Sequence, residues 1–168
     1  MCGIIGYVGR QEAAPILLEG LERMEYRGYD STGMAVCGDG VLRVCKKKGR
    51  VQVLREMSHD GADLPGTLGI GHTRWATHGE PSDVNAHPHL SQSGKFAVVH
   101  NGIIENFIAL KEELLQKGYT FRSETDTEVV AQLLDYYYSD CGDFFEAMNR
   151  LLHAVDGAYA LGIICADY

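Results

Sequence analysis

Short blocks of apolar residues alternate with polar residues along the first 60 positions, a pattern that indicates both strands and helices. The apolar stretch from Ile4 to Val8 predicts a buried strand. Residues 12–26 repeat apolar side chains at helical spacing, which predicts an amphipathic helix that ends before Gly28. The apolar face of that helix consists of Leu17, Leu18, Leu21 and Met24.

The middle of the chain predicts strands, one short helix and a long polar segment. Gly38-Asp39-Gly40 is typical of a tight hairpin turn, here between a strand that ends at Cys37 and one that begins at Val41. The short helix is expected where Val51, Leu54 and Met57 recur, and the polar segment from Ala76 to Lys95 is long enough to indicate a functional loop. The expected strands are Thr32 to Cys37, Val41 to Lys46, Gly69 to Trp75 and Phe96 to His100.

The last third of the chain predicts three helices and a final strand. Thr125 and Glu128 have the spacing of a capping box, which predicts the start of the second helix. The apolar residues expected to pack from the first two helices are Ile108, Leu110, Leu114 and Leu115, with a stop at Gly118, and then Val129, Val130, Leu133 and Leu134. The third helix is expected from Phe144 to Leu152 and the strand from Ala158 to Cys165.

Length and composition place the chain among globular proteins of one domain. It has 168 residues, of which 45% are hydrophobic and 23% charged, and no apolar run approaches the roughly 20 residues that cross a bilayer. The net charge of −8 disfavours nucleic-acid binding, since residues 103–168 hold 12 acidic and only 4 basic side chains. Five cysteines without a C-x-x-C pair, and the absence of a signal-peptide pattern, favour a cytoplasmic protein with free thiols that needs no membrane partner.

Cys2 is the first candidate for chemistry. Methionine before a small residue is normally removed, and Cys2 would then carry a free α-amino group. Such an amine titrates near about 8 and a thiol near about 8.5, so one residue could supply both a nucleophile and a base. The alternative is that Cys2 is only a small apolar side chain at the start of a strand.

A histidine-rich region follows in G-I-G-H-T-R-W-A-T-H-G, from Gly69 to Gly79, and in N-A-H-P-H, from Asn85 to His89. A zinc site is one interpretation, but no carboxylate or cysteine joins the histidines at a standard interval, and we expect no metal. A hydrogen-bonded loop is another. Arg74-Trp75 favours a third interpretation, a binding site for a substrate that carries a carboxylate. Arginine can bind a carboxylate with two hydrogen bonds, and tryptophan can cover a small ligand.

Two further motifs suggest how a substrate could be held. Asn101-Gly102 follows an apolar strand; it could be a tight turn, or its side-chain amide and backbone N–H could bind an oxyanion. Asp126 lies in S-E-T-D-T-E, where it could serve only the helix start or could pair with an ammonium group. Together, Arg74 and Asp126 would recognise both charged ends of an α-amino acid.

The motifs taken together, in this order, resemble the glutaminase domain (type 2 glutamine amidotransferase) of the glucosamine-6-phosphate synthase family. The resemblance covers essentially the whole chain. Amidophosphoribosyltransferases are a more distant match, since their pattern prefers Tyr-Ser in place of Trp75-Ala76 and R-G-Q-D-S in place of the R-G-Y-D-S that begins at Arg27. The motifs are C-G-I-I-G-Y-V-G, Y-R-G-Y-D-S-T-G, G-H-T-R-W-A-T-H-G, N-A-H-P-H, V-H-N-G-I-I-E-N and S-E-T-D-T-E-V.

This resemblance implies an α+β fold, the four-layer αββα sandwich of N-terminal-nucleophile hydrolases with two antiparallel sheets. It also implies hydrolysis of L-glutamine to glutamate and ammonia without a cofactor. Cys2 would be the nucleophile and its own amine the base, with Asn101 and Gly102 as the oxyanion hole. The residues implied to bind glutamine are Arg74, Trp75, Thr77, His78, His87 and Asp126, with Arg27 in support.

In the complete enzyme of this family, a sugar isomerase domain uses the ammonia to convert fructose 6-phosphate to glucosamine 6-phosphate. We therefore expect residues 1–168 to be a glutaminase domain that continues beyond Tyr168, and the full-length enzyme to be a homo-oligomer. The alternative is a catalytically inert module that binds glutamine or has a regulatory role.

Overall fold

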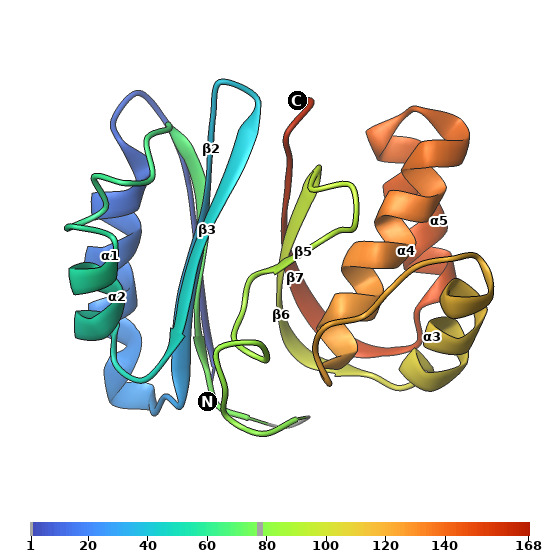
Figure 1. Ribbon diagram of the computed structural model, residues 1–168, viewed down its shortest axis with the longest axis horizontal. Coiled ribbons are helices and arrows are strands. Elements are labelled where there is room, and N and C mark those ends of the chain that lie inside the picture. The colour runs from blue at the N-terminus through green and yellow to red at the C-terminus, as the bar shows by residue number, and fades with distance from the viewer. Residues whose placement is uncertain (1, 77–78) are drawn as a thin grey trace.

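Two antiparallel sheets pack face to face between two layers of helices in this computed structural model, which describes residues 2–76 and 79–168 (Figure 1). The first sheet has the strand order β1 (Gly3–Val8), β4 (Leu68–Arg74), β2 (Ser31–Gly38) and β3 (Val41–Lys48). The second sheet consists of β5 (His89–Leu90), β6 (Phe96–Ile104) and β7 (Gly157–Cys165).

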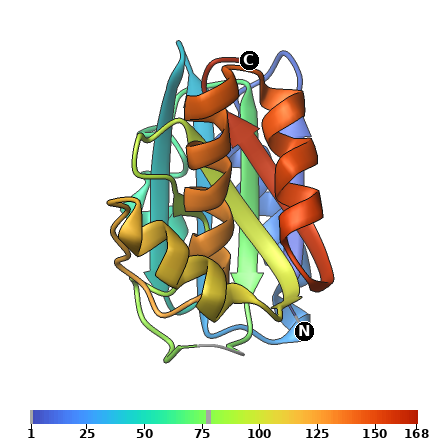
Figure 2. The same cartoon turned by 90° about the vertical axis from the view of Figure 1, so that its right-hand side faces the viewer.

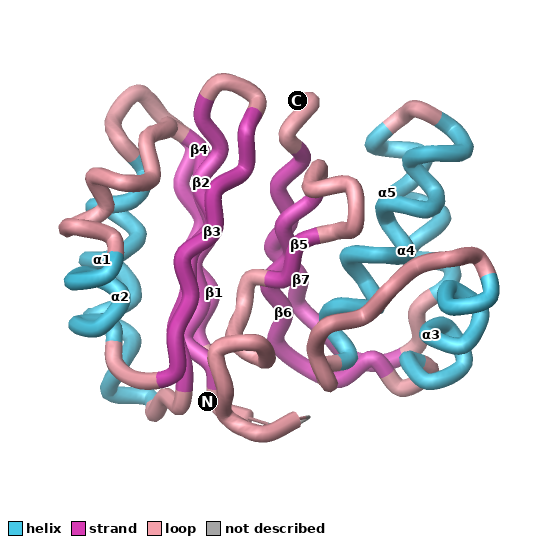
Figure 3. The backbone as a smooth tube through the Cα atoms, viewed as in Figure 1, coloured by secondary structure: helices cyan, strands magenta, loops and turns pink. Residues whose placement is uncertain are grey.

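Helices cover the outer face of each sheet. In the view turned by 90°, the helices of the second half lie in front of their sheet, whose strand β6 is yellow and strand β7 red (Figure 2). The tube view shows the order of layers as helix, strand, strand and helix (Figure 3). The first layer consists of α1 (Ala13–Met24) and α2 (Val51–Met57), with the 3₁₀ turn η1 (Glu25–Arg27) between α1 and β2, and the last layer of α3 (Phe107–Gln116), α4 (Asp126–Cys141) and α5 (Phe144–Ala154).

Alternation along the strands divides the apolar side chains among three core regions. On β6, Ala97 and Val99 pack between the two sheets, whereas Phe96 and Val98 pack under the helices, because successive side chains of a strand point to opposite faces. Most of the predicted α1 face is fully buried, with Met24 partly buried against the same cluster. The sandwich of two sheets and two helical layers confirms the predicted α+β fold.

The pairing of β4 with both β1 and β2 brings distant motifs to one end of the sandwich. Gly3 pairs with Thr73, and Ser31 pairs with Arg74, both in antiparallel register. The residue before β1, Cys2, therefore lies beside the end of β4. This arrangement places the first motif of the sequence against the histidine-rich motif.

The predicted hairpin, helices and final strand are confirmed to within a few residues. The Asn101-Gly102 pair, however, lies inside β6, which continues to Ile104, so the strand end predicted at this pair is wrong, and the alternative of a tight turn does not hold. The long loop contains the short strand β5. The strand continues because Asn101 and Gly102 pair with Ala160 and Tyr159 of β7, a partner that lies far away in the sequence.

Two predicted helical details also differ. Helix α3 buries Leu110 and Leu114 but leaves Ile108 and Leu115 half exposed or more, because only one side of α3 packs into the core cluster that it shares with α4. At the start of α4, the Thr125 hydroxyl accepts a hydrogen bond from the backbone N–H of Glu128 as expected. The Glu128 carboxylate instead accepts from the backbone N–H groups of residues 122 and 123, so only half of the capping box forms.

No helix among the described residues is long and apolar enough to cross a membrane.

Candidate active site

The thiol of Cys2 lies against the backbone of Trp75 at the end of β4. The Trp75 N–H donates a hydrogen bond to Sγ over 3.1 Å, and Sγ lies 3.4 Å from the Trp75 carbonyl oxygen. The next residue, Gly3, donates its N–H to the Thr73 hydroxyl over 3.1 Å. A Cβ atom at Gly3 would lie only 2.7 Å from the sulfur of Met24 and 2.9 Å from the Thr73 hydroxyl, so β1 starts close to both side chains.

Asn101 and Gly102 come from the second sheet, and Asn101 contacts Cys2 at the end of the first sheet. The Asn101 side-chain amide donates to the Cys2 carbonyl oxygen over 3.4 Å, and its oxygen lies 2.8 Å from Nε2 of His72. Gly102 has a φ of +117°, and a Cβ atom there would lie 2.2 Å from the Ala158 carbonyl oxygen. Both features require glycine.

These residues line one small pocket of about 40 Å³. Its lining includes every predicted catalytic residue and every predicted substrate-binding residue that the structure describes; Thr77 and His78 lie outside the described residues. A larger pocket of about 660 Å³ is lined from β3, β5 and α4 and contains none of the predicted residues. The chemistry favours the smaller pocket, which is lined by Cys2, His72, Arg74, Trp75, His87, His100, Asn101, Gly102, Thr125, Asp126 and Thr127.

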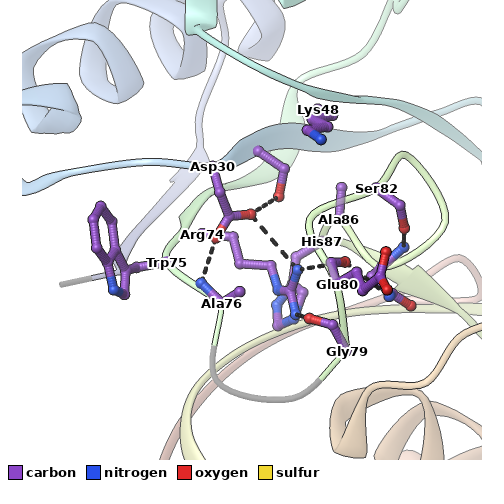
Figure 4. Close-up of polar contacts among 12 residues, drawn as sticks. Asp30, Lys48, Arg74, Trp75, Ala76, Gly79, Glu80, Ser82, Ala86 and His87 are labelled. Carbon is purple, nitrogen blue, oxygen red and sulfur yellow. Dashed lines mark hydrogen bonds and ion pairs between the residues drawn. The ribbon is translucent and has the colours of Figure 1, made fainter.

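The Arg74 guanidinium is almost fully buried and is held by groups from two segments (Figure 4). Its Nη2 donates to the Gly79 carbonyl over 3.1 Å, and Nη1 lies 3.5 Å from the Glu80 carbonyl oxygen and 3.6 Å from Oδ1 of Asp30. The other Asp30 oxygen accepts a hydrogen bond from the backbone N–H of Ala76. Asp30 thus joins Arg74 to the start of the loop that follows β4.

The Asp126 carboxylate, which is also buried, occupies the first turn of α4. One oxygen accepts a 2.9 Å hydrogen bond from the backbone N–H of Ile104, and the other lies 3.8 Å from Nδ1 of His100. A negative charge is stabilised at a helix N-terminus by the helix dipole. Arg74 and Asp126 therefore bring opposite charges to the lining of the same pocket.

Buried imidazole rings form the floor behind the pocket. Burial lowers the pKa of His72 to about 4 and lowers the pKa values of His87 and His89 well below the usual range. His87 lines the pocket, but its Nδ1 accepts from the backbone N–H of His100 and its Nε2 lies 3.3 Å from the Thr127 hydroxyl. Both ring nitrogens of His87 therefore contact the protein. The described residues include no group of three or more side chains suited to holding a metal ion.

Trp75 forms the outer wall of the pocket, with 55% of its surface exposed. A Cβ atom at Gly28 would lie 2.8 Å from the indole ring, which shows how closely η1 approaches Trp75. Arg27, predicted in a supporting role, is exposed in η1 and is not part of the pocket lining. From the same motif, Asp30 contacts Arg74 from outside the lining. The sequence did not single out Asp30, nor the pocket residues His72 and Thr127 as parts of the substrate site, although all three lie within the motifs described above.

Comparison with known proteins identifies the family of the chain. The model of the glutamine amidotransferase domain family matches residues 35–164. The chain belongs to this family. The glutamine amidotransferase domain is 61% identical over 167 residues to a glutamine–fructose-6-phosphate aminotransferase (isomerizing) of Caldanaerobacter subterraneus subsp. tengcongensis, covering 99% of the chain. It is 56% identical over 164 residues to the protein of the same name from Aquifex aeolicus, covering 98% of the chain.

The glutamine amidotransferase domain spans only 27% of the length of each of these relatives. Their identity confirms the resemblance to the glucosamine-6-phosphate synthase family. Among solved structures, the glutamine phosphoribosylpyrophosphate amidotransferase of B. subtilis superposes with a TM-score of 0.83 at 29% identity, over 99% of this chain and 35% of that one. A regulatory enzyme of purine biosynthesis superposes with a TM-score of 0.84 at 28% identity, over 99% and 36%. These neighbours confirm the N-terminal-nucleophile sandwich.

Proposed function

We propose that this domain hydrolyses L-glutamine to glutamate and ammonia through a γ-glutamyl thioester on Cys2. The observation that carries the proposal is the position of the Cys2 residue beside the Asn101 amide, with the Gly102 backbone next to it in β6. A thiol that shares a pocket with N–H donors suits attack on an amide carbonyl, since such donors can stabilise the oxyanion that forms.

The reaction proceeds in two steps. The Cys2 sulfur attacks the side-chain amide carbon of glutamine, the Asn101 and Gly102 N–H groups hold the oxyanion, and the C–N bond breaks as a proton passes to the leaving ammonia. Water then attacks the thioester, which releases glutamate and restores the thiol. The base in both steps is the α-amino group that Cys2 gains when Met1 is removed, as in enzymes whose N-terminal residue supplies its own base.

Charges at the pocket select the substrate. Arg74 binds the α-carboxylate of glutamine and Asp126 binds its α-ammonium group, which matches the opposite charges that line the pocket. Trp75, Thr77 and His78 belong to the segment that covers glutamine, His87 supports the pocket wall, and Arg27 supports the residues around it.

For the whole protein we propose the activity in the name of its relatives. A sugar isomerase domain outside this chain would receive the ammonia and convert fructose 6-phosphate to glucosamine 6-phosphate, in a full-length homo-oligomer. The support is the identity of 61% and 56% to two such proteins, which are almost four times as long as this chain.

The decisive test of glutamine hydrolysis compares glutamate release by the wild type with that by Cys2→Ala. We expect the variant to lose hydrolysis and to keep glutamine binding, measured by calorimetry. Asn101→Ala should be milder and lower kcat by about 10² to 10³, the usual effect of one lost oxyanion donor. Substantial turnover by Cys2→Ala would refute the nucleophile, and glutamine binding without hydrolysis by the wild type would favour the inert binding module.

A further inference from the structure

The imidazole of His72 lines the catalytic pocket, yet the reaction proposed above gives it no role. His72 lies on β4, is 1% exposed, and places Nε2 2.8 Å from the side-chain oxygen of Asn101 on β6. The two strands belong to different sheets. This contact therefore connects the sheets at the catalytic end of the sandwich.

Two contacts together decide which way the Asn101 amide faces. With its oxygen toward His72, its NH₂ group lies 3.4 Å from the Cys2 carbonyl oxygen and donates to it. In the flipped orientation, the amide oxygen would lie at that distance from the carbonyl oxygen, and two acceptors would face each other. An amide oxygen only accepts, so His72 carries its proton on Nε2 and donates.

The His72 ring is itself held firmly. It stacks on the ring of His87, with centroids 4.2 Å apart and planes inclined by 19°. His87 is fixed in turn by the backbone N–H of His100 and by the Thr127 hydroxyl. Since burial keeps the pKa of His72 at about 4, the ring is neutral at neutral pH, and its Nε2–H remains a hydrogen-bond donor on either side of that pKa.

We propose that His72 is a positioning residue for the oxyanion hole: its Nε2–H holds the oxygen of Asn101 so that the amide NH₂ faces the reacting carbonyl. This inference rests on the proposed glutamine hydrolysis and deepens it. His72 touches no reacting atom. Its contribution is made through Asn101 and is realised when the oxyanion forms, because only then does the amide donor gain a charged partner.

The matched variants are His72→Gln and His72→Asn. Both carry a neutral amide, but the glutamine side chain places its NH₂ near the position of Nε2, whereas the asparagine side chain is one methylene shorter. We expect His72→Asn to lower kcat by about 10- to 100-fold with little change in KM, and His72→Gln to recover most of the loss, since a misplaced donor costs less than the 10² to 10³ of a deleted one.

Binding measurements separate positioning from general damage to the fold. The γ-aldehyde analogue of glutamine adds the Cys2 thiol across its C=O bond, with the thiol proton passing to the oxygen, and so forms a tetrahedral adduct in the oxyanion hole. Glutamate forms no such adduct. His72→Asn should weaken aldehyde binding by the same factor as kcat and leave glutamate binding unchanged. Equal losses for both ligands would overturn the inference.

A double-mutant cycle tests whether His72 acts through Asn101. If His72 acts through Asn101, then His72→Asn combined with Asn101→Ala should be no slower than Asn101→Ala alone. Leu151→Ala, which damages the buried core of α5 away from the pocket, should combine additively with Asn101→Ala. Additive losses for His72→Asn would overturn the inference while leaving glutamine hydrolysis intact. A wild type that neither hydrolyses glutamine nor binds the aldehyde would instead refute the proposed function, and the inference with it.

Discussion

The carboxylate of Asp30 lies 3.6 Å from the guanidinium of Arg74, and it also accepts a hydrogen bond from the backbone N–H of Ala76. One aspartate thereby positions the proposed carboxylate-binding residue and the segment that follows it. The side chain of Asp30 is 16% exposed and that of Arg74 4%, so the pair is shielded from water and its interaction is stronger than that of a surface salt bridge.

We predict that Asp30→Asn raises the KM for glutamine about 10-fold and lowers kcat less, because Arg74 loses the buried charged partner that holds its guanidinium in place. Steady-state kinetics measure both constants. Asp83→Asn is the matched control, since Asp83 is an exposed carboxylate that pairs with Lys47 and the backbone of Lys48 outside the pocket. Equal KM values for the wild type and Asp30→Asn would contradict the role of Asp30.

We predict that Gly102→Ala lowers both stability and turnover. The added methyl group would lie 2.2 Å from the Ala158 carbonyl oxygen, and the backbone φ of +117° disfavours any side chain, so β6 and β7 must separate. Gly94→Ala is the control for the free-energy cost of a positive φ alone, because Gly94 also has a positive φ but has no atom within 4 Å of its added Cβ. Thermal unfolding should show a larger loss for Gly102→Ala, and an equal loss would show that the close approach of β7 does not matter.

The sequence predicted the elements of this fold better than the contacts between them. Local periodicity and turn residues located the helices and the hairpin. The continuation of β6 through Asn101-Gly102 was missed because it depends on pairing with β7, more than 50 residues later. The four-layer arrangement was implied by the family resemblance and not by the periodicity.

For the candidate site too, the sequence predicted the residues better than the contacts between them. Its motifs identified residues that do line one pocket, such as Cys2 and Asp126. The contacts that join motifs could not be read from the sequence: Asp30 meets Arg74 across neighbouring strands, and His72 meets Asn101 across two sheets. Such contacts depend on strand register and sheet packing, which no local pattern encodes.

The buried histidines predict a dependence of stability on pH. Burial lowers the pKa of His72 to about 4, and those of His87 and His89 well below the usual 6.5, so these rings stay neutral in the folded state. In the unfolded chain they take up protons below about 6.5. The unfolded state then binds more protons than the folded state, and the free energy of unfolding falls as the pH decreases from about 6.5 toward about 4.

Urea unfolding at pH 7.5, 6 and 5 measures this slope, to which each such histidine adds up to about 1.4 kcal/mol per pH unit. His89→Gln should reduce the slope. His59→Gln should not, because His59 is exposed and its pKa is raised by the hydrogen bond to Asp63, which stabilises the folded state at low pH. A slope unchanged by His89→Gln would show that His89 does not titrate differently in the two states.

Asp126 offers the sharpest test of substrate recognition, because its charge can be removed while its shape is kept. We predict that Asp126→Asn raises the KM for glutamine by roughly 10- to 100-fold, the effect of losing a charge-assisted contact of about 1.5 to 3 kcal/mol. The asparagine oxygen can still accept the hydrogen bond from the Ile104 N–H, so helix α4 should keep its start.

Arg74→Lys should raise KM similarly, since a single ammonium does not reproduce two guanidinium hydrogen bonds to a carboxylate. The two variants differ toward a γ-glutamyl substrate that lacks the α-amino group. Wild type and Arg74→Lys should both discriminate strongly against it, whereas Asp126→Asn should lose most of that discrimination. Equal discrimination by Asp126→Asn and the wild type would mean that Asp126 serves only the helix start and the backbone of Ile104.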